Sequence, residues 1–152
     1  MKKTVVALVL AGLASAVFAQ QPLKPEEMIK FRKSGYSFMS WNMGKIKANL
    51  DGNFNKEQVI AAANVVAATA NSGMGALFGP GTEKDAGNEK TRVKPEFFQQ
   101  PEKVRELAMA FNKEANELAK VAAGGDPAAI KAQFGKTGAA CKACHDDFRK
   151  ED

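Results

Sequence analysis

The residues best suited to chemistry form one short run near the C-terminus, Cys141-Lys142-Ala143-Cys144-His145. The order C-x-x-C-H is typical of the covalent attachment of a c-type haem. In that chemistry the two thiols form thioether bonds to the haem vinyl groups, and the histidine coordinates the iron. We therefore expect Cys141 and Cys144 to bind one haem c covalently, with His145 as the metal ligand.

The rest of the composition makes this pattern more specific. The chain has two cysteines and one histidine, and all three lie in this run. A structural zinc site normally needs four nitrogen or sulfur ligands, and no other cysteine or histidine is available for one. A thioredoxin-like pair would lie in a βαβ context, and the sequence shows no strand pattern. A buried or disulfide-bonded cysteine pair remains as an alternative, but it leaves the histidine unexplained.

The N-terminal residues have the pattern of a secretory signal peptide. Two lysines precede a short apolar run, and Val17 and Ala19 occupy the small-residue positions before a cleavage point. The apolar run is too short to span a bilayer, and we expect no membrane span elsewhere. We predict a signal peptide over residues 1–19, one mature domain over residues 20–152, and a periplasmic location. Export agrees with the haem prediction, because c-type haem is attached outside the cytoplasm.

The charge balance argues against nucleic acid as a partner. The chain has 22 lysines and arginines against 17 acidic residues, a formal net charge of +5. This excess is mild and spread along the chain. No cluster combines basic with aromatic residues, as a nucleic-acid surface would.

Apolar residues recur at spacings of three and four in four stretches, which predicts four helices. They run from about residue 24 to 50, 55 to 71, 101 to 123 and 126 to 148. Two of the connections are short, and one is long and polar, over residues 79–95. We therefore predict an all-α fold, an antiparallel four-helix bundle with one covalently attached haem c.

The same spacing predicts which side of each helix faces the core. The motif cysteines and histidine continue the inner row of the last helix, where a bundle would hold a cofactor. The predicted inner rows are Met28, Arg32, Gly35 or Tyr36, Met39, Met43, Ile46 and Leu50; Val59, Ala62, Ala63, Val66, Ala67 and Ala70; Val104, Leu107, Ala108, Phe111, Ala115, Leu118 and Ala122; and Ile130, Phe134, Gly138, Cys141, Cys144 with His145, and Phe148.

The first helix carries a second apolar row, formed by Phe31, Phe38 and Trp41. A helix with two apolar faces needs two surfaces to pack against. Part of this row can belong to a wide core stripe. The functional alternative is a homodimer through the first two helices, to which the alanine-rich second helix would contribute.

The second axial position of the iron decides between two functions. A methionine there favours simple electron transfer, and an open position allows small molecules to bind. No second histidine exists and no methionine follows His145, so a protein ligand would come from upstream. Methionine at helical spacing is usually core filler. The upstream candidates are Met28, Met39, Met43, Met74 and Met109.

Several segments together resemble cytochrome c-prime, a family of class II c-type cytochromes. They are residues 138–149 around the motif, 32–47 of the first helix, and 78–82 and 92–98 of the long connection. The resemblance covers essentially the whole mature chain and is closest to members with a tyrosine in the distal pocket. It implies a covalent haem with five-coordinate, high-spin iron that binds nitric oxide and carbon monoxide, usually in a homodimer.

The resemblance also implies roles for individual residues. Arg32 matches an arginine that approaches a haem propionate, and Arg149 matches a basic residue beside the proximal face of the haem. Lys33 stands where many members have glutamine, and it can still pair with a propionate. Tyr36 stands where low-spin relatives have an iron-binding methionine, which favours an open site. Met39 shares a helix face with Arg32 and Tyr36, so we include it among the predicted haem contacts.

Three functions are compatible with a c-type haem in this chain. A gas-binding haem protein, with a role in nitric oxide handling and electron transfer, is the prediction. A low-spin His/Met electron carrier with an unknown redox partner is the alternative. A peroxidase-like enzyme is disfavoured, because the sequence offers no distal histidine as a general base.

Overall fold

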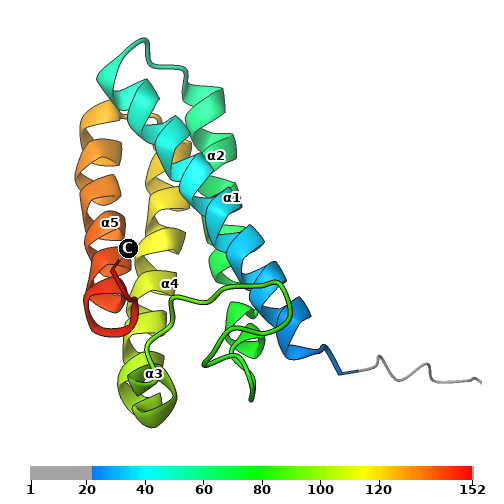
Figure 1. Ribbon diagram of the computed structural model, residues 1–152. Helices are drawn as coiled ribbons and strands as arrows, with labels where there is room; N and C mark the ends of the chain where they lie inside the picture. Colours follow the sequence, from blue (N-terminus) through cyan, green and yellow to red (C-terminus); the bar gives the residue numbers. More distant parts are fainter. Residues whose placement is uncertain (1–21, 152) are drawn as a thin grey trace, which may run out of the picture.

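The computed structural model describes residues 22–151, and the predicted signal peptide lies outside them. The described chain forms four long helices that run alternately up and down, an antiparallel four-helix bundle (Figure 1). No helix within the described range has the length and hydropathy that a membrane span requires. The helices are α1 (Pro25–Asp51), α2 (Lys56–Ala70), η1 (Met74–Leu77), α3 (Glu96–Gln99), α4 (Pro101–Gly124) and α5 (Pro127–Phe148).

Local signals in the sequence explain where these helices begin. Pro25 is the first helical residue of α1, where its missing N–H costs nothing. The Asn55 side chain accepts a hydrogen bond from the backbone N–H of Gln58 at the start of α2, at 2.9 Å. Asp126 caps α5 in the same way, accepting from the N–H of Ala128 at 3.0 Å. The predicted helix boundaries are confirmed to within a few residues.

The main core lies at the end of the bundle that carries the two short turns. There the predicted inner row of α2 is buried along its whole length, which confirms that prediction. Small alanine side chains let α2 approach α1 and α4 closely. The core cluster draws on all four long helices and consists of Ile46, Val59, Ala62, Ala63, Leu118, Ala122 and Ile130.

The inner row of α1 differs from the prediction. Met28 and Leu50 are only half-buried, and Ile29, Asn42 and Asn49 are buried instead. Asparagine is tolerated there because its amide is satisfied locally. The Asn49 side-chain oxygen accepts a hydrogen bond from the N–H of Asn55 at 2.8 Å, which ties α1 to the turn before α2.

The inner row of α5 also differs. Gln133 and Thr137 are buried, whereas the predicted Phe134 is half-buried. Both buried polar side chains donate to the backbone carbonyl of Glu114 on α4, each at 3.2 Å. A polar seam therefore joins α4 to α5.

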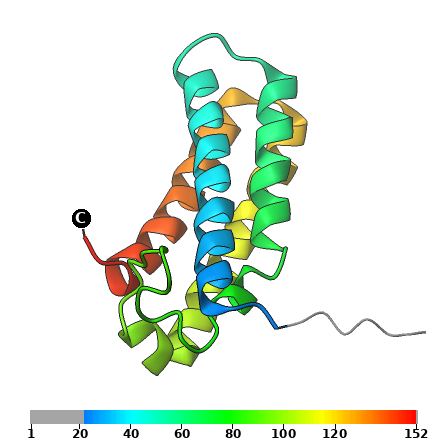
Figure 2. The ribbon, with the colours of Figure 1, turned by 45° about the vertical axis from the view of Figure 1, so that its right-hand side comes forward.

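The opposite end of the bundle is closed by the long crossover between α2 and α4. It passes through η1 and the irregular residues 78–95, and crosses the foot of the bundle (Figure 2). The start of α1, the start of α4 and the end of α5 all lie at this end. The crossover therefore lies beside the C-terminal motif of α5.

Candidate cofactor site

The candidate site lies where α1 and α5 separate. α1 packs along α2, α2 along α4, and α4 along α5, but α1 and α5 touch far less. The C-terminal turns of α5 carry the C-x-x-C-H motif, and the N-terminal turns of α1 carry Arg32 and Tyr36. The fold therefore brings the two predicted groups of site residues to the same end of the bundle.

Cys141 and Cys144 lie about one helical turn apart, and both thiols are free and half-buried. Burial raises the pKa of Cys141, and the neighbouring Cys144 raises it further. Burial, followed by the charge of Asp147, raises the pKa of Cys144. Both thiols are therefore held in the protonated form at neutral pH.

His145 is exposed, so the prediction that it shares the core-facing row was wrong. Consecutive residues of a helix are about 100° apart around its axis, so Cys144 and His145 cannot point the same way. This offset suits the motif. The two thiols would bind the vinyl groups of a haem and the imidazole would bind its iron, so their side chains have to point in different directions.

Arg149 lies beside His145, one helical turn further on. Its Nη1 atom is 3.4 Å from Nδ1 of His145. Partial burial lowers the pKa of His145, the charge of Arg92 lowers it further, and Asp146 opposes both. The imidazole is therefore neutral at pH 7, which is the form that binds a metal ion.

Tyr36 lies close enough to the two thiols for them to influence its pKa. Its ring meets Phe78 edge-on, with centroids 6.5 Å apart, and 41% of the residue remains exposed. Burial of the phenol raises its pKa to about 12, and the sulfur of Cys144 contributes to the rise. The phenol is therefore neutral across the physiological range and is a poor metal ligand.

Arg32 is 4% exposed, although it is charged. Its Nη2 atom donates to Oγ1 of Thr91 at 2.8 Å and to the carbonyl oxygen of Thr82 at 3.3 Å. Its Nη1 atom donates to Oγ1 of Thr82 and to the carbonyl oxygen of Leu77, each at 3.2 Å. The guanidinium also lies over the Phe78 ring, 4.4 Å from its centroid.

These acceptors of Arg32 are all neutral. Burial lowers the pKa of Arg32, yet a guanidinium stays protonated in proteins. A buried cation held only by hydroxyl and carbonyl oxygens is suited to an additional anionic partner such as a carboxylate. Sequence reasoning missed Thr82 and Thr91, because no local pattern links them to α1.

Lys33 and Met39 have other partners in the structure. The Lys33 ammonium pairs with the Glu89 carboxylate in the crossover at 2.6 Å. Met39 is buried in a small core cluster with Val66, Ala70 and Ala115. Of the predicted α1 contacts, Arg32 and Tyr36 therefore lie nearest to the motif side of the bundle, while Met39 contributes to the protein core.

The apolar row of α4 is buried in the second half of the helix and partly exposed in the first half. Ala115, Leu118 and Ala122 are buried, as predicted. Towards the start of the helix, Leu107 is only half-buried and Ala108 is exposed. An apolar wall is thus left uncovered by protein at the end of the bundle that carries the motif.

Together these residues fit a haem c. Two thiols at the required spacing, a neutral imidazole and a buried guanidinium supply the donor set. The uncovered apolar wall of α4 matches an apolar macrocycle, and Arg32 matches its carboxylate substituents.

Aromatic residues fix the crossover against α5. The rings of Phe78 and Phe97 stack with centroids 4.4 Å apart, and Phe97 meets Phe148 edge-on at 5.6 Å. Phe97 therefore anchors the long connection, and Phe98 packs against it with ring centroids 5.3 Å apart. The participation of Phe148 could not be read from the sequence, because it depends on the fold of the crossover.

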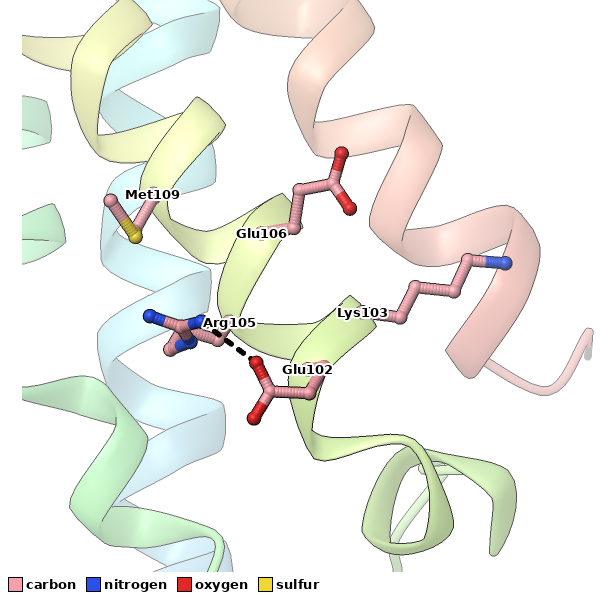
Figure 3. A pocket seen from close by; sticks show the side chains of 5 residues that line it. All are labelled: Glu102, Lys103, Arg105, Glu106 and Met109. Carbon is pink, nitrogen blue, oxygen red and sulfur yellow. Dashed lines mark hydrogen bonds and ion pairs between the residues drawn. The ribbon is translucent and has the colours of Figure 1, made fainter.

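A separate hollow lies on the surface of the first turns of α4 (Figure 3). Glu102 and Arg105 pair there at 2.7 Å, and Lys103 extends towards the last turn of α5, where it pairs with Asp147 at 3.0 Å. The hollow contains no motif residue, and Glu102, Lys103 and Arg105 are paired, so we do not assign the cofactor to it. Its lining residues are Glu102, Lys103, Arg105, Glu106 and Met109.

Comparison with known proteins gives consistent matches over this domain. The family model described as "Cytochrome C'" matches residues 27–149. The cytochrome c′ of Allochromatium vinosum is 59% identical over 146 residues, covering 96% of this chain and 94% of the relative.

Solved structures agree in fold. A cytochrome c′ described as having a ligand-controlled dimer dissociation is 61% identical, with a TM-score of 0.84, covering 85% of this chain and 98% of that one. A variant of the Alcaligenes xylosoxidans protein in complex with nitric oxide is 30% identical, with a TM-score of 0.75, covering 85% and 98%. A variant with bound carbon monoxide is 29% identical, with a TM-score of 0.75, covering 86% and 100%.

Proposed function

Because this chain belongs to the cytochrome c′ family, we propose that it is a periplasmic protein whose haem iron is five-coordinate, high-spin and open to nitric oxide and carbon monoxide. Members of this family carry a covalently attached haem c, and the two free cysteines of the motif are available for it. The proposed role is nitric oxide handling together with electron transfer, and it is one of binding rather than catalysis.

The observation that carries the proposal is the environment of Tyr36. A neutral phenol, whose pKa is raised to about 12 by burial, shares its space with the two thiols. Met39, the methionine that follows it by three residues, is buried against α2 and α4 in the core. The side chain nearest to the proposed gas site is therefore a poor iron ligand, which supports an open position.

Each remaining residue has a defined task in this proposal. When bound, the haem supplies an iron that takes a diatomic ligand and changes oxidation state. Cys141 and Cys144 fix the group covalently, and His145 offers a neutral imidazole nitrogen. Arg32 supplies a buried positive charge for a propionate, while Arg149 lies against the histidine ring. Tyr36 limits the size of the ligand admitted.

A homodimer is the second part of the proposal. Phe31, Phe38 and Trp41 are exposed on α1, and the last two stack with ring centroids 5.6 Å apart. A row of large exposed aromatic side chains on one helix is costly in water and favours a partner surface. The solved relative described as a dissociating dimer supports the same assignment.

Haem extraction and electronic spectra test the central proposal. Acidified acetone should leave the haem on the protein, because thioether bonds resist acid. The ferric and ferrous spectra should be high-spin, and the ferrous form should bind both carbon monoxide and nitric oxide. Complete extraction would refute covalent attachment. A low-spin spectrum with no gas binding would favour the His/Met electron carrier instead.

A further inference from the structure

A cluster of basic side chains surrounds the surface where His145 is exposed. Residues 92–94 of the crossover pair with residues 148–150 at the end of α5. The N–H of Lys94 donates to the Phe148 carbonyl at 2.9 Å, and the N–H of Lys150 donates to the Arg92 carbonyl at 2.7 Å. We call Arg92, Lys94, Arg149 and Lys150 the basic corner. The hollow they border is lined by Arg92, Lys94, His145, Asp146, Arg149, Lys150 and Glu151.

Two carboxylates near this corner are paired with lysines outside it. Asp146 is engaged by Lys142, whose Nζ lies 2.6 and 2.7 Å from its two carboxylate oxygens. Asp147 pairs with Lys103 from α4 at 3.0 Å. Glu151 is the other carboxylate beside the hollow. Two acids of the last turn are thus matched by lysines outside the corner.

Two side chains of the corner, those of Lys94 and Arg149, contact neutral groups. The Lys94 ammonium donates to the backbone carbonyl of Asp146 at 3.1 Å. Arg149 contacts the His145 ring, and both Arg149 and Lys150 are exposed. The corner therefore presents an excess of positive charge to solvent, immediately around the proposed iron ligand.

We propose that the basic corner is the docking surface for an acidic face of a redox-partner protein. This inference rests on the proposed electron-transfer function and names the chemistry of its unknown partner. Complementary charge raises association rates and orients partners without needing a large interface, as short-lived redox complexes require. Lysines on flexible stems suit such a polar surface, because they adapt to more than one arrangement.

The position of the corner is compatible with the rest of the proposed assembly. It is built from the crossover and the residues that follow α5, and it contains no residue of α1 or α2. A homodimer through those two helices would leave it accessible. His145 lines the same hollow, so a docked partner would lie directly beside the proposed iron ligand.

Charge reversal tests the inference in the intact haem protein. The corner variant carries Lys94→Glu and Lys150→Glu. The control carries Lys113→Glu and Lys136→Glu, two exposed lysines on α4 and α5 that lie outside the hollow. Both variants change the net charge equally. Stopped-flow reduction is measured with anionic Fe(EDTA)²⁻ and with cationic hexaammineruthenium(II), at low and at high salt.

At low salt the corner variant should be reduced roughly tenfold more slowly by the anionic reagent and faster by the cationic one. The control should show a much smaller change, and high salt should remove the difference. The neutral pair Lys94→Gln and Lys150→Gln should lie between wild type and the reversed pair. Equal effects in the corner and control variants would overturn the inference.

A second measurement does not depend on electron transfer. Binding of poly-L-glutamate at low salt, followed by sedimentation, should be weakened several-fold in the corner variant and little changed in the control. Equal binding by all variants would overturn the inference. Failure of the proposed function would look different, because the wild-type protein would then hold no covalent haem and neither reductant would reduce it.

Discussion

Tyr36 is the most informative single residue, because it is the one tyrosine of the chain and lies beside the motif thiols. Its phenol is held neutral by burial, with the pKa raised to about 12. An ordinary phenol titrates near pH 10. The folded pKa therefore exceeds the unfolded one, so Tyr36 favours folding below about pH 10, and this contribution is lost as the pH rises towards 12.

A pH titration of phenolate absorbance should measure this shift directly. With Tyr36→Phe as the blank, the folded protein should show a midpoint near 12, and the denatured protein a midpoint near 10. The difference in unfolding free energy between wild type and Tyr36→Phe should fall over the same range. A folded midpoint near 10 would mean that water reaches the phenol freely.

Replacing Tyr36 with methionine should close the open axial position. A thioether presented from the same helical position is an iron ligand, unlike a neutral phenol. We expect a low-spin spectrum and much slower carbon monoxide binding to the ferrous form. Met39→Leu serves as the control and should leave the spin state unchanged, because Met39 packs in the core. A low-spin wild type that becomes high-spin in Met39→Leu would identify Met39 as the ligand.

Arg32→Met should destabilise the fold markedly. The change removes four hydrogen bonds and leaves buried oxygens of Thr82 and Thr91 without that donor. We expect a loss of about 2–4 kcal/mol in urea unfolding. Arg105→Met is the matched control: Arg105 is exposed and pairs with Glu102 in a surface ion pair, so the loss should stay below about 1 kcal/mol. Similar losses in both variants would contradict the structural role of Arg32.

The haem c cofactor could be predicted from the sequence, because the order C-x-x-C-H is typical of its attachment, and the roles of Cys141, Cys144 and His145 stay predictions. The sequence did not predict the partners of Arg32, since Thr91 lies 59 residues further along and no periodic pattern connects the two. The direction of His145 was also missed. Helical spacing placed it on an inner row, but a step of one residue turns it away from Cys144.

At the scale of elements, the crossover between α2 and α4 depends on a few polar residues. Oδ1 of Asp85 accepts a hydrogen bond from the N–H of Thr91 at 2.9 Å, and Asp85 pairs with Lys90 at 2.9 Å. The bond from Thr91 and the contact with Lys90 hold the pKa of Asp85 below its usual value. The carboxylate therefore orders the loop at neutral pH, and this effect is lost as the pH falls through its folded pKa.

Limited proteolysis within residues 79–95 should report this loss. Wild type should become more readily cleaved as the pH falls through the folded pKa of Asp85, which is lower than that of an ordinary aspartate. Asp85→Asn should be cleaved faster already at neutral pH and should respond less to acid. Asp51→Asn, which removes an exposed i,i+4 ion pair with Lys47 on α1, should leave loop cleavage unchanged. Equal responses in both variants would show that Asp85 does not order the loop.

Helix boundaries and the inner face of α2 were predictable, because caps and apolar spacing are local. The polar seam between α4 and α5 was not. Gln133 and Thr137 interrupt the apolar pattern, and their burial makes sense only beside the Glu114 carbonyl. The spacing of apolar residues predicts that α5 is a helix. Which of its polar side chains are buried depends on the acceptors that α4 offers, and these cannot be read from local spacing.

At the scale of the whole molecule, α1 presents its aromatic row to solvent. Trp41 is 58% exposed, and its ring is covered on one side by the Lys45 ammonium, 4.5 Å from the ring centroid. The row was recognised from the sequence as a possible second packing surface. Its exposure in the single chain favours a second copy as that surface.

Trp41→Glu should convert the proposed homodimer into a monomer. A carboxylate in place of the indole would remove apolar contact area from the interface and would be costly to desolvate there. Sedimentation at micromolar concentration should report twice the monomer mass for wild type and the monomer mass for the variant. Met109→Glu is the control, because Met109 is 62% exposed on α4 and should not affect association. A monomeric wild type would refute the proposed dimer.

The crossover also sets an order of events during synthesis. The α1–α2 hairpin can form early, but Arg32 must wait for acceptors that lie 45 to 59 residues later. The motif helix is made last, and its final residues complete the crossover by pairing with residues 92–94. In the folded chain the two thiols are half-buried, so we expect haem to attach to them faster before α5 docks than after it.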